Sequence, residues 1–200
     1  MLDKIADYLN TTPQTVVITL VVLAVLFVII WIKISMDEKK GVDSQEKADI
    51  RKIISNLVPD GEQYIAAYAH SKEVYGGARM RREVYHYYAI GFRKDQTDHL
   101  WVVPIGVERG KIVYTEPMCL NAQTVACVGG RPAELVVHFP GSRDTCILSV
   151  DRSNTKLGKE CQVNIQQPEE AKAYEEFAPA FQEQVNNAIG VDRKGRKLKK

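Results

Sequence analysis

The chain has 200 residues, of which 45% are hydrophobic and 26% charged. Because domains usually run about 100–150 residues, this length allows one full domain beside an anchor, but not two. The net charge of +2 is too small to suggest nucleic-acid binding by the chain as a whole, although six of the 27 basic residues lie in the last eight positions.

An uncharged segment runs from Thr11 to Ile32, after a short N-terminal tail of residues 1–12. As an α-helix it would extend about 33 Å at about 1.5 Å per residue, enough for a bilayer core of about 30 Å. Thr12 and Pro13 supply a helix cap and a proline at the first helical position. We therefore predict one transmembrane helix over residues 13–34, acting as a tether and followed by a polar connector over residues 35–42.

A cleaved signal peptide is the alternative interpretation of this segment. The region before it is not basic, the apolar run is longer than a signal peptide needs, and no small-x-small cleavage site follows Trp31. Lys4 is the only basic residue before the span, whereas several follow it: Lys33, Lys39, Lys40, Lys47, Arg51 and Lys52. The positive-inside rule then predicts a single-pass cell-membrane protein with its N-terminus outside and its C-terminal domain in the cytoplasm.

In that reducing compartment, the four cysteines are predicted to be free and mostly buried. They are Cys119, Cys127, Cys146 and Cys161. Their spacing contains no C-x-x-C pair, so neither a zinc site nor any other cofactor is predicted. With the opposite orientation, four cysteines could instead form two disulfides.

The soluble part is predicted to begin with a helix over residues 43–58. Asp43 is a suitable N-cap, and Glu46 is placed three residues later for a capping box. Apolar residues follow at helical spacing and form one stripe: Ile50, Ile53, Ile54 and Leu57. Pro59, Asp60 and Gly61 then predict a turn.

A series of short strands is predicted after this turn. The expected strands are Gln63–Ser71, Glu83–Lys94, His99–Glu108, Lys111–Glu116, Ala122–Val128, Glu134–Phe139, Thr145–Val150 and Glu160–Gln166. The expected turns between them are Gly76-Gly77, Arg109-Gly110, Gly129-Gly130, Pro140-Gly141 and Asn154 to Gly158. Pro104 interrupts the third strand and predicts an edge or a bulge there.

A final amphipathic helix is predicted after Pro168, ending at Gly190. Its apolar face comprises Tyr174, Phe177, Phe181, Val185 and Ala188. Pro179 lies inside this helix and predicts a kink or a break. The fold class is thus mainly β (α+β), with about seven to eight antiparallel strands and a C-terminal helix suited to cover the open end of a barrel.

This order of elements, from about Gln63 to Ile189, resembles the bacterial pleckstrin-homology-like (PH-like) barrel domain. The resemblance is one of element order and implies a PH-like barrel with its helix over residues 63–190. An α+β sandwich is the alternative architecture.

No catalytic motif is present: the sequence lacks a G-x-S-x-G elbow, a P-loop, an H-E-x-x-H pair and a G-x-G-x-x-G loop. The histidines are expected to be packed strand residues: His70, His86, His99 and His138. Gly129-Gly130-Arg131-Pro132 could approach a phosphate, but a hairpin turn explains it equally well. We therefore predict that the protein is not an enzyme.

Two basic features suggest binding. In phosphoinositide-binding members of the family, the loop between the first two strands carries a lysine and then a basic-x-basic triplet. The resemblance therefore implies a lipid or anion site at Lys72, Arg79, Arg81 and Arg82, with a solvated hairpin as the alternative. The second feature is the basic tail, residues 191–200, which is expected to be disordered. It could contact the inner leaflet or an acidic partner, or it could serve only to keep the chain soluble.

The functional hypothesis is a membrane-anchored, non-enzymatic interaction module whose cytoplasmic PH-like domain binds a protein partner. The alternatives are binding of anionic lipid head groups through the Lys72–Arg82 loop, and a structural accessory role in a membrane complex through the edge at Pro104 or the helix stripe. Some tyrosines around the first loop could contact the partner: Tyr75, Tyr85, Tyr87 and Tyr88.

Overall fold

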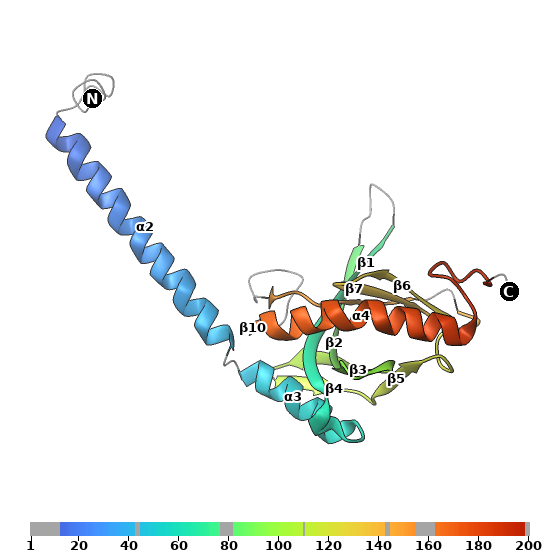
Figure 1. Cartoon of the computed structure of the whole chain (residues 1–200). Helices are drawn as coiled ribbons and strands as arrows, with labels where there is room; N and C mark the ends of the chain where they lie inside the picture. The colour runs from blue at the N-terminus through green and yellow to red at the C-terminus, as the bar shows by residue number, and fades with distance from the viewer. Residues whose placement is uncertain are drawn as a thin grey trace. The chain divides into compact units, whose positions relative to one another are not determined.

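A computed structural model describes residues 13–42, 45–76, 82–109, 111–142, 145–154 and 163–198 (Figure 1). The chain divides into two units, Met1–Gly41 and Val42–Lys200.

The first unit contains helix α2, which spans Pro13–Val42. The helix continues through residues 35–42, where the sequence predicted a connector, because this polar stretch is rich in Met, Glu and Lys, which are strong helix formers. The large apolar side chains described between Val17 and Ile32 are exposed. Among the described residues, no helix is long and apolar enough to cross a membrane, so the predicted span stays a prediction.

Helix α3 (Gln45–Leu57) opens the second unit and confirms the predicted helix. Its Ile50, Ile53 and Ile54 are buried. A short 3-10 helix, η1 (Gly61–Gln63), follows the predicted turn. A Cβ atom on Gly61 would lie 2.2 Å from the Ile54 carbonyl oxygen, so only glycine allows the chain to turn this closely under α3.

An antiparallel sheet forms the body of this unit. Its strands are β1 (Ile65–Tyr75), β2 (Arg82–Arg93), β3 (Gln96–Glu108), β4 (Lys111–Tyr114), β5 (Met118–Asn121), β6 (Cys127–Arg131), β7 (Glu134–His138) and β8 (Thr145–Ser149). The strand order is β4-β3-β2-β1-β8-β7-β6, and β5 also pairs with β3. This confirms the mainly β (α+β) class and the prediction of about eight antiparallel strands with a C-terminal helix.

The predicted strand Ala122–Val128 is wrong. Asn121 ends β5, and its side-chain oxygen accepts hydrogen bonds from the Gln123 and Thr124 amides at 2.9 and 3.2 Å. This Asx turn separates β5 from β6, which begins at Cys127. The last predicted strand is also shorter than expected: within residues 163–166 only β10 (Ile165–Gln166) is extended, paired with β9 (Ser153–Asn154).

The predicted Gly129-Gly130 turn is wrong as well. Both glycines lie inside β6, and the turn is Pro132-Ala133, because Arg131 pairs directly with Glu134. Gly130 has φ +102° there, and a Cβ atom on it would lie 2.1 Å from the Glu134 carbonyl oxygen. Gly130 is therefore glycine because of close backbone packing across the hairpin.

Pro104 does not lie on an edge strand. It sits in β3, opposite Tyr88 of β2, at the point where the other partner of β3 changes from β5 to β4. At this change of partner the missing N–H of a proline breaks no regular ladder bond, while the Pro104 carbonyl still accepts from the Thr115 amide at 3.1 Å.

The sheet has a core on each face of its first half. One face of β1–β3 packs with β6–β8 and helix α4 (Pro168–Ile189) around Phe92, Phe177 and Phe181. The other face packs against α3, around Tyr68 and Ile54.

Helix α4 confirms the predicted C-terminal helix and its end at Gly190, which has φ +82°. The helix runs without a break through Pro179, because burial of the flanking Phe177 and Phe181 outweighs one lost backbone hydrogen bond. Ala188, predicted to lie on the apolar face, is exposed.

Two buried amide side chains, Gln167 and Asn186 near the two ends of α4, form hydrogen bonds with backbone groups of strands β1 and β6. The Gln167 side chain accepts from the Tyr68 amide and donates to the Tyr68 carbonyl, both at 2.8 Å. Asn186 makes the same pair of bonds with Val128 of β6, at 2.8 and 2.7 Å. Backbone groups of Tyr68, on β1, and of Val128, on the terminal strand β6, are therefore satisfied by these side chains.

Candidate functional site

The predicted anion site lies on the hairpin of β1 and β2, and the structure describes only half of it. Lys72 lies 3.3 Å from the Glu83 carboxylate and 5.4 Å from the centre of the Tyr85 ring. Arg82 is exposed and pairs with Tyr75 across the hairpin. Arg79 and Arg81 lie outside the described residues.

Carboxylates accompany Lys72 and His86 in this hairpin. The Tyr85 hydroxyl donates to Glu83 at 2.7 Å, and this bond raises the pKa of Tyr85. On the other face, Glu73 accepts from Tyr75 and lies 3.8 Å from His86. The charge of Lys72 is thus balanced within the hairpin, whereas Arg82 is exposed and has no ion pair with the described residues, so it is the described residue of the predicted site that stays available to an anion.

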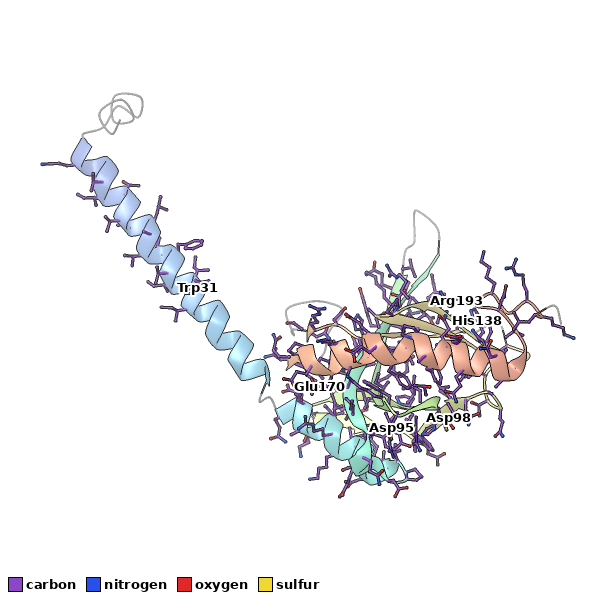
Figure 2. The ribbon with its side chains drawn as sticks, in the orientation of Figure 1. Trp31, Asp95, Asp98, His138, Glu170 and Arg193 are labelled. Atoms are coloured by element: carbon purple, nitrogen blue, oxygen red, sulfur yellow. The ribbon has the colours of Figure 1, made fainter. Side chains whose placement is uncertain are left out.

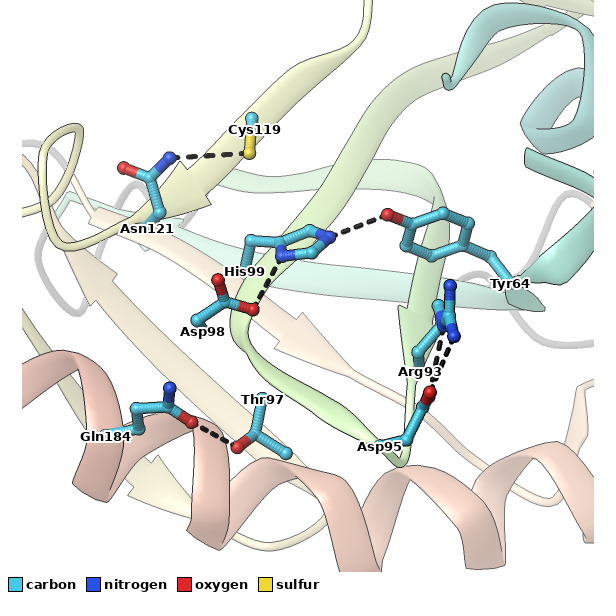
Figure 3. Close-up of polar contacts among 9 residues, drawn as sticks. All are labelled: Tyr64, Arg93, Asp95, Thr97, Asp98, His99, Cys119, Asn121 and Gln184. Carbon is cyan, nitrogen blue, oxygen red and sulfur yellow. Dashed lines mark hydrogen bonds and ion pairs between the residues drawn. The ribbon is translucent and has the colours of Figure 1, made fainter. Parts of the chain in front are cut away.

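The densest polar cluster lies around β3 and could not be read from the sequence (Figure 3). The His99 ring lies between the Tyr64 hydroxyl, 2.6 Å from Nε2, and the Asp98 carboxylate, 2.8 Å from Nδ1 (Figure 3). A histidine held between an acid and a hydroxyl is the arrangement that activates nucleophiles in hydrolases.

This cluster lacks the other parts that such chemistry needs. A cleft of about 570 Å³ between α3 and the start of β1 is lined by Tyr64, but not by His99 or Asp98. The thiol of Cys119, nearby on β5, has its pKa raised by burial, which keeps it protonated. We interpret the cluster as structural: its hydrogen bonds connect Tyr64, the residue before β1, to His99 of β3.

No group of three or more His, Cys, Asp or Glu side chains among the described residues could hold a metal ion. The described cysteines, Cys119, Cys127 and Cys146, are free, as predicted. Cys161 lies outside the described residues.

A groove between α3 and β4 combines the features of a binding site for an extended peptide. Its volume is about 480 Å³, and it is lined by Gln45, Asp49, Lys52, Ile53, Asn56, Lys111, Ile112 and Tyr114. Ile112 and Tyr114 are opposite Val107 and Ile105 in the register, so they point to the face that α3 covers. In the described part of the chain, β4 pairs only with β3 and leaves its second edge open.

The groove combines exposed apolar area with positive charge. Tyr114 is 54% exposed and Val113, on the opposite face of β4, is 38% exposed. Lys52 and Lys111 are both exposed, and neither forms an ion pair with the described residues. Asp49 is already bonded to Gln45 at 2.9 Å. The sequence predicted the strand Lys111–Glu116, but not that it lies at the end of the sheet. The short length of β4 and the lysine at its start are typical of edge strands.

The basic tail is not disordered over residues 191–198. Asp192 accepts hydrogen bonds from the Lys194 and Arg196 amides, both at 2.9 Å, and binds the Arg196 guanidinium at 2.6 and 2.7 Å. Gly195, at φ +72°, allows the turn, and Val191 forms a bridge with Lys197. The prediction of disorder rested on the high charge of the tail alone. The sequence from Asp192 to Gly195 is an Asp-x-x-Gly pattern, which is a turn signal.

This C-terminal turn, residues 191–198, packs on the outer face of β6. A Cβ atom on Gly129 would lie 3.1 Å from the Arg193 carbonyl, and one on Gly195 would lie 3.2 Å from the Cys127 sulfur. Arg193, Lys194, Arg196 and Lys197 are all exposed (Figure 2 labels Arg193). The turn therefore holds four cations at a defined position.

Comparison with known proteins gives no further assignment, because no family model, curated protein or solved structure matches the chain.

Proposed function

We propose that the protein is a membrane-anchored, non-enzymatic interaction module whose cytoplasmic domain binds an extended segment of a protein partner in the α3–β4 groove. The observation that carries this proposal is the open edge of β4 beside that groove. An added strand would satisfy the backbone groups of this edge, and its alternate side chains would enter the groove.

The charge of the groove defines the chemistry of the partner. Lys52 and Lys111 line the groove together with the apolar residues Ile53, Ile112 and Tyr114. A segment that alternates apolar and acidic residues fits both features, because its apolar side chains would cover the apolar residues while its carboxylates meet the two lysines. A basic segment would be repelled by the same pair.

The anchor is proposed from the uncharged run Thr11–Ile32 together with the helical conformation of α2. It predicts that the full chain stays in the membrane fraction after extraction with alkaline carbonate. Release into the supernatant would contradict it.

The orientation can be tested at Lys172, which is exposed on α4. A Lys172→Cys variant should resist a membrane-impermeant maleimide in intact cells and react after lysis. Labelling in intact cells would place the domain outside.

A PH-like barrel remains our proposal for the architecture. The run of antiparallel strands followed by one helix over the shared core supports it. Nuclear Overhauser contacts between β5 and β6 in the full chain would support closure of the barrel, and their absence would favour an α+β sandwich.

Site-specific photo-crosslinking in native membranes tests the groove directly. A photoreactive phenylalanine analogue at Tyr114 should form an adduct that mass spectrometry maps to an extended acidic segment of the partner. Tyr75 is the matched control, because it is a tyrosine of nearly equal exposure, 53% against 54%, at the far hairpin.

The charge-reversed variants Lys52→Glu and Lys111→Glu should abolish the Tyr114 adduct. Each replaces an attractive contact by a repulsive one, which typically costs several kcal/mol in an interface. Equal adducts at Tyr114 and Tyr75, or an adduct that survives both charge reversals, would contradict the groove as the binding site.

A further inference from the structure

A small pocket lies between the β6–β7 turn, α4 and the C-terminal turn, on a part of the domain that the proposed partner site does not use. Its volume is about 70 Å³, and its walls are formed by Gly130, Arg131, Pro132, Leu135, Ala178, Pro179, Gln182 and Arg193. Among the described residues, the charged side chains that line it are the two arginines. Two arginines thus line a space of the size of one small ion.

The fold brings these two arginines together from distant parts of the sequence. Arg131 is the last residue of β6 and lies two positions after Gly129, on the same face of the strand. Arg193 belongs to the C-terminal turn, which crosses that face so closely that a Cβ atom on Gly129 would lie 3.1 Å from the Arg193 carbonyl oxygen. Asp192 and Gly195 hold the turn in this position.

Neither guanidinium is saturated by a carboxylate. Arg131 is 78% exposed at its side chain and uses one nitrogen, Nη2, on Glu134 at 3.3 Å. Since a guanidinium has five N–H donors, most of its donors stay available. The described residues give the Arg193 side chain no ion-pair partner. Two like charges at one pocket repel each other until an anion lies between them.

We propose that Arg131 and Arg193 bind a phosphate group in this pocket, either free or carried by the head group of an anionic lipid. Planar guanidinium groups bind phosphate oxygens in pairs, which a tetrahedral dianion satisfies better than a halide does. The small volume admits the phosphate alone, so any remainder of the ligand stays outside, where Lys194 and Lys197 add positive charge. Arg131 thus contributes to the proposed anion site because the fold places Arg193 at the same pocket. The glycines before it do not form a phosphate-binding loop.

Hydrogen–deuterium exchange of the full chain in nanodiscs tests this site and separates the two sources of phosphate. In discs of neutral phosphatidylcholine, inorganic phosphate is titrated against chloride at constant ionic strength, which keeps screening constant. In the second arm, phosphatidic acid replaces part of the lipid and no phosphate is added. The amides of residues 129–132 and 191–198 are followed in both arms.

Slower exchange of these amides with inorganic phosphate would show the free-anion form of the site. Slower exchange in phosphatidic acid discs would show that a lipid head group reaches it. Arg131→Gln and Arg193→Gln should each weaken the response about tenfold or more, since each removes charge-assisted hydrogen bonds. Arg152→Gln, which removes another exposed arginine that does not line the pocket, should leave it unchanged.

Exchange across α4 and β7 reports whether each variant keeps its fold. Arg131→Gln leaves the C-terminal turn intact and so keeps the test valid if Arg193→Gln loosens that turn. No protection in either arm, or equal protection in Arg131→Gln, Arg193→Gln and Arg152→Gln, would overturn the proposal.

Discussion

Replacing Gln167 by leucine tests the idea that α4 completes the sheet through its amide side chains. Gln167 is fully buried and makes three hydrogen bonds: with the Tyr68 amide at 2.8 Å, the Tyr68 carbonyl at 2.8 Å and the Asp151 carbonyl at 2.9 Å. Leucine has nearly the same volume, so the substitution leaves little empty space. It removes the bonds and little else.

The cost follows from the groups that are left behind. The Asp151 residue is exposed, so its carbonyl can turn to water, but Tyr68 is buried and its N–H and C=O would lose their bonds with the Gln167 side chain. Each buried backbone group left without a partner costs about 1–3 kcal/mol. We therefore expect Gln167→Leu to lower the free energy of unfolding by about 2–6 kcal/mol, a large part of the 5–15 kcal/mol typical of a domain.

Urea unfolding of the full chain in detergent, followed by far-UV circular dichroism, measures this difference. The control is Gln166→Leu, one residue earlier, whose amide donates to the partly exposed Ser153 hydroxyl at 2.7 Å. Its expected cost is within about 1 kcal/mol, as for most surface substitutions. Equal midpoints for the two variants would refute the role given to Gln167.

Three further predictions concern other parts of the domain. Asn186→Leu should cost about 1–3 kcal/mol in the same unfolding assay, less than Gln167→Leu, because Gln182 still donates to the Val128 carbonyl at 3.1 Å and only the Val128 N–H is orphaned; an equal or greater loss would contradict this. The Arg196 guanidinium and the backbone amides lower the pKa of Asp192 to about 2, so this carboxylate stabilises the turn above its ordinary pKa near 4 and loses that effect as the pH falls toward 2. Amide exchange of residues 193–198 should therefore accelerate over that interval in the wild type, once corrected for intrinsic rates, but show no such step in Asp192→Asn. Burial raises the pKa of the Cys146 thiol to about 11, so Ellman's reagent at pH 8 should modify Cys146 only after unfolding, and rapid reaction of the native protein would count against its burial.

The alternative hypothesis of a structural accessory role was based on two surfaces that are not available in the structure. Pro104 lies in a strand that is paired on both sides, and the apolar stripe of α4 is buried in the core of its own domain. An accessory role in a membrane complex would have to use other surfaces, and the open edge of β4 is one such surface in the described sheet.

Local patterns in the sequence predicted most of the elements. The spacing of Ile50, Ile53 and Ile54 predicted α3, and the proline at the start and the glycine at the end predicted the limits of α4. Such signals depend on residues three or four positions apart or on one backbone conformation, so they can be read without knowledge of the fold. The uncharged run before the domain is likewise a property of the sequence alone.

Long-range contacts decided what the sequence left open. Gly129 and Gly130 look like a turn in isolation, but they are glycine because the C-terminal turn and the opposite strand approach them closely. The same contacts bring Arg131 and Arg193 to one pocket, and the sheet order leaves β4 as the open edge. No local pattern carries this information, because each of these sites exists only where segments distant in the sequence meet.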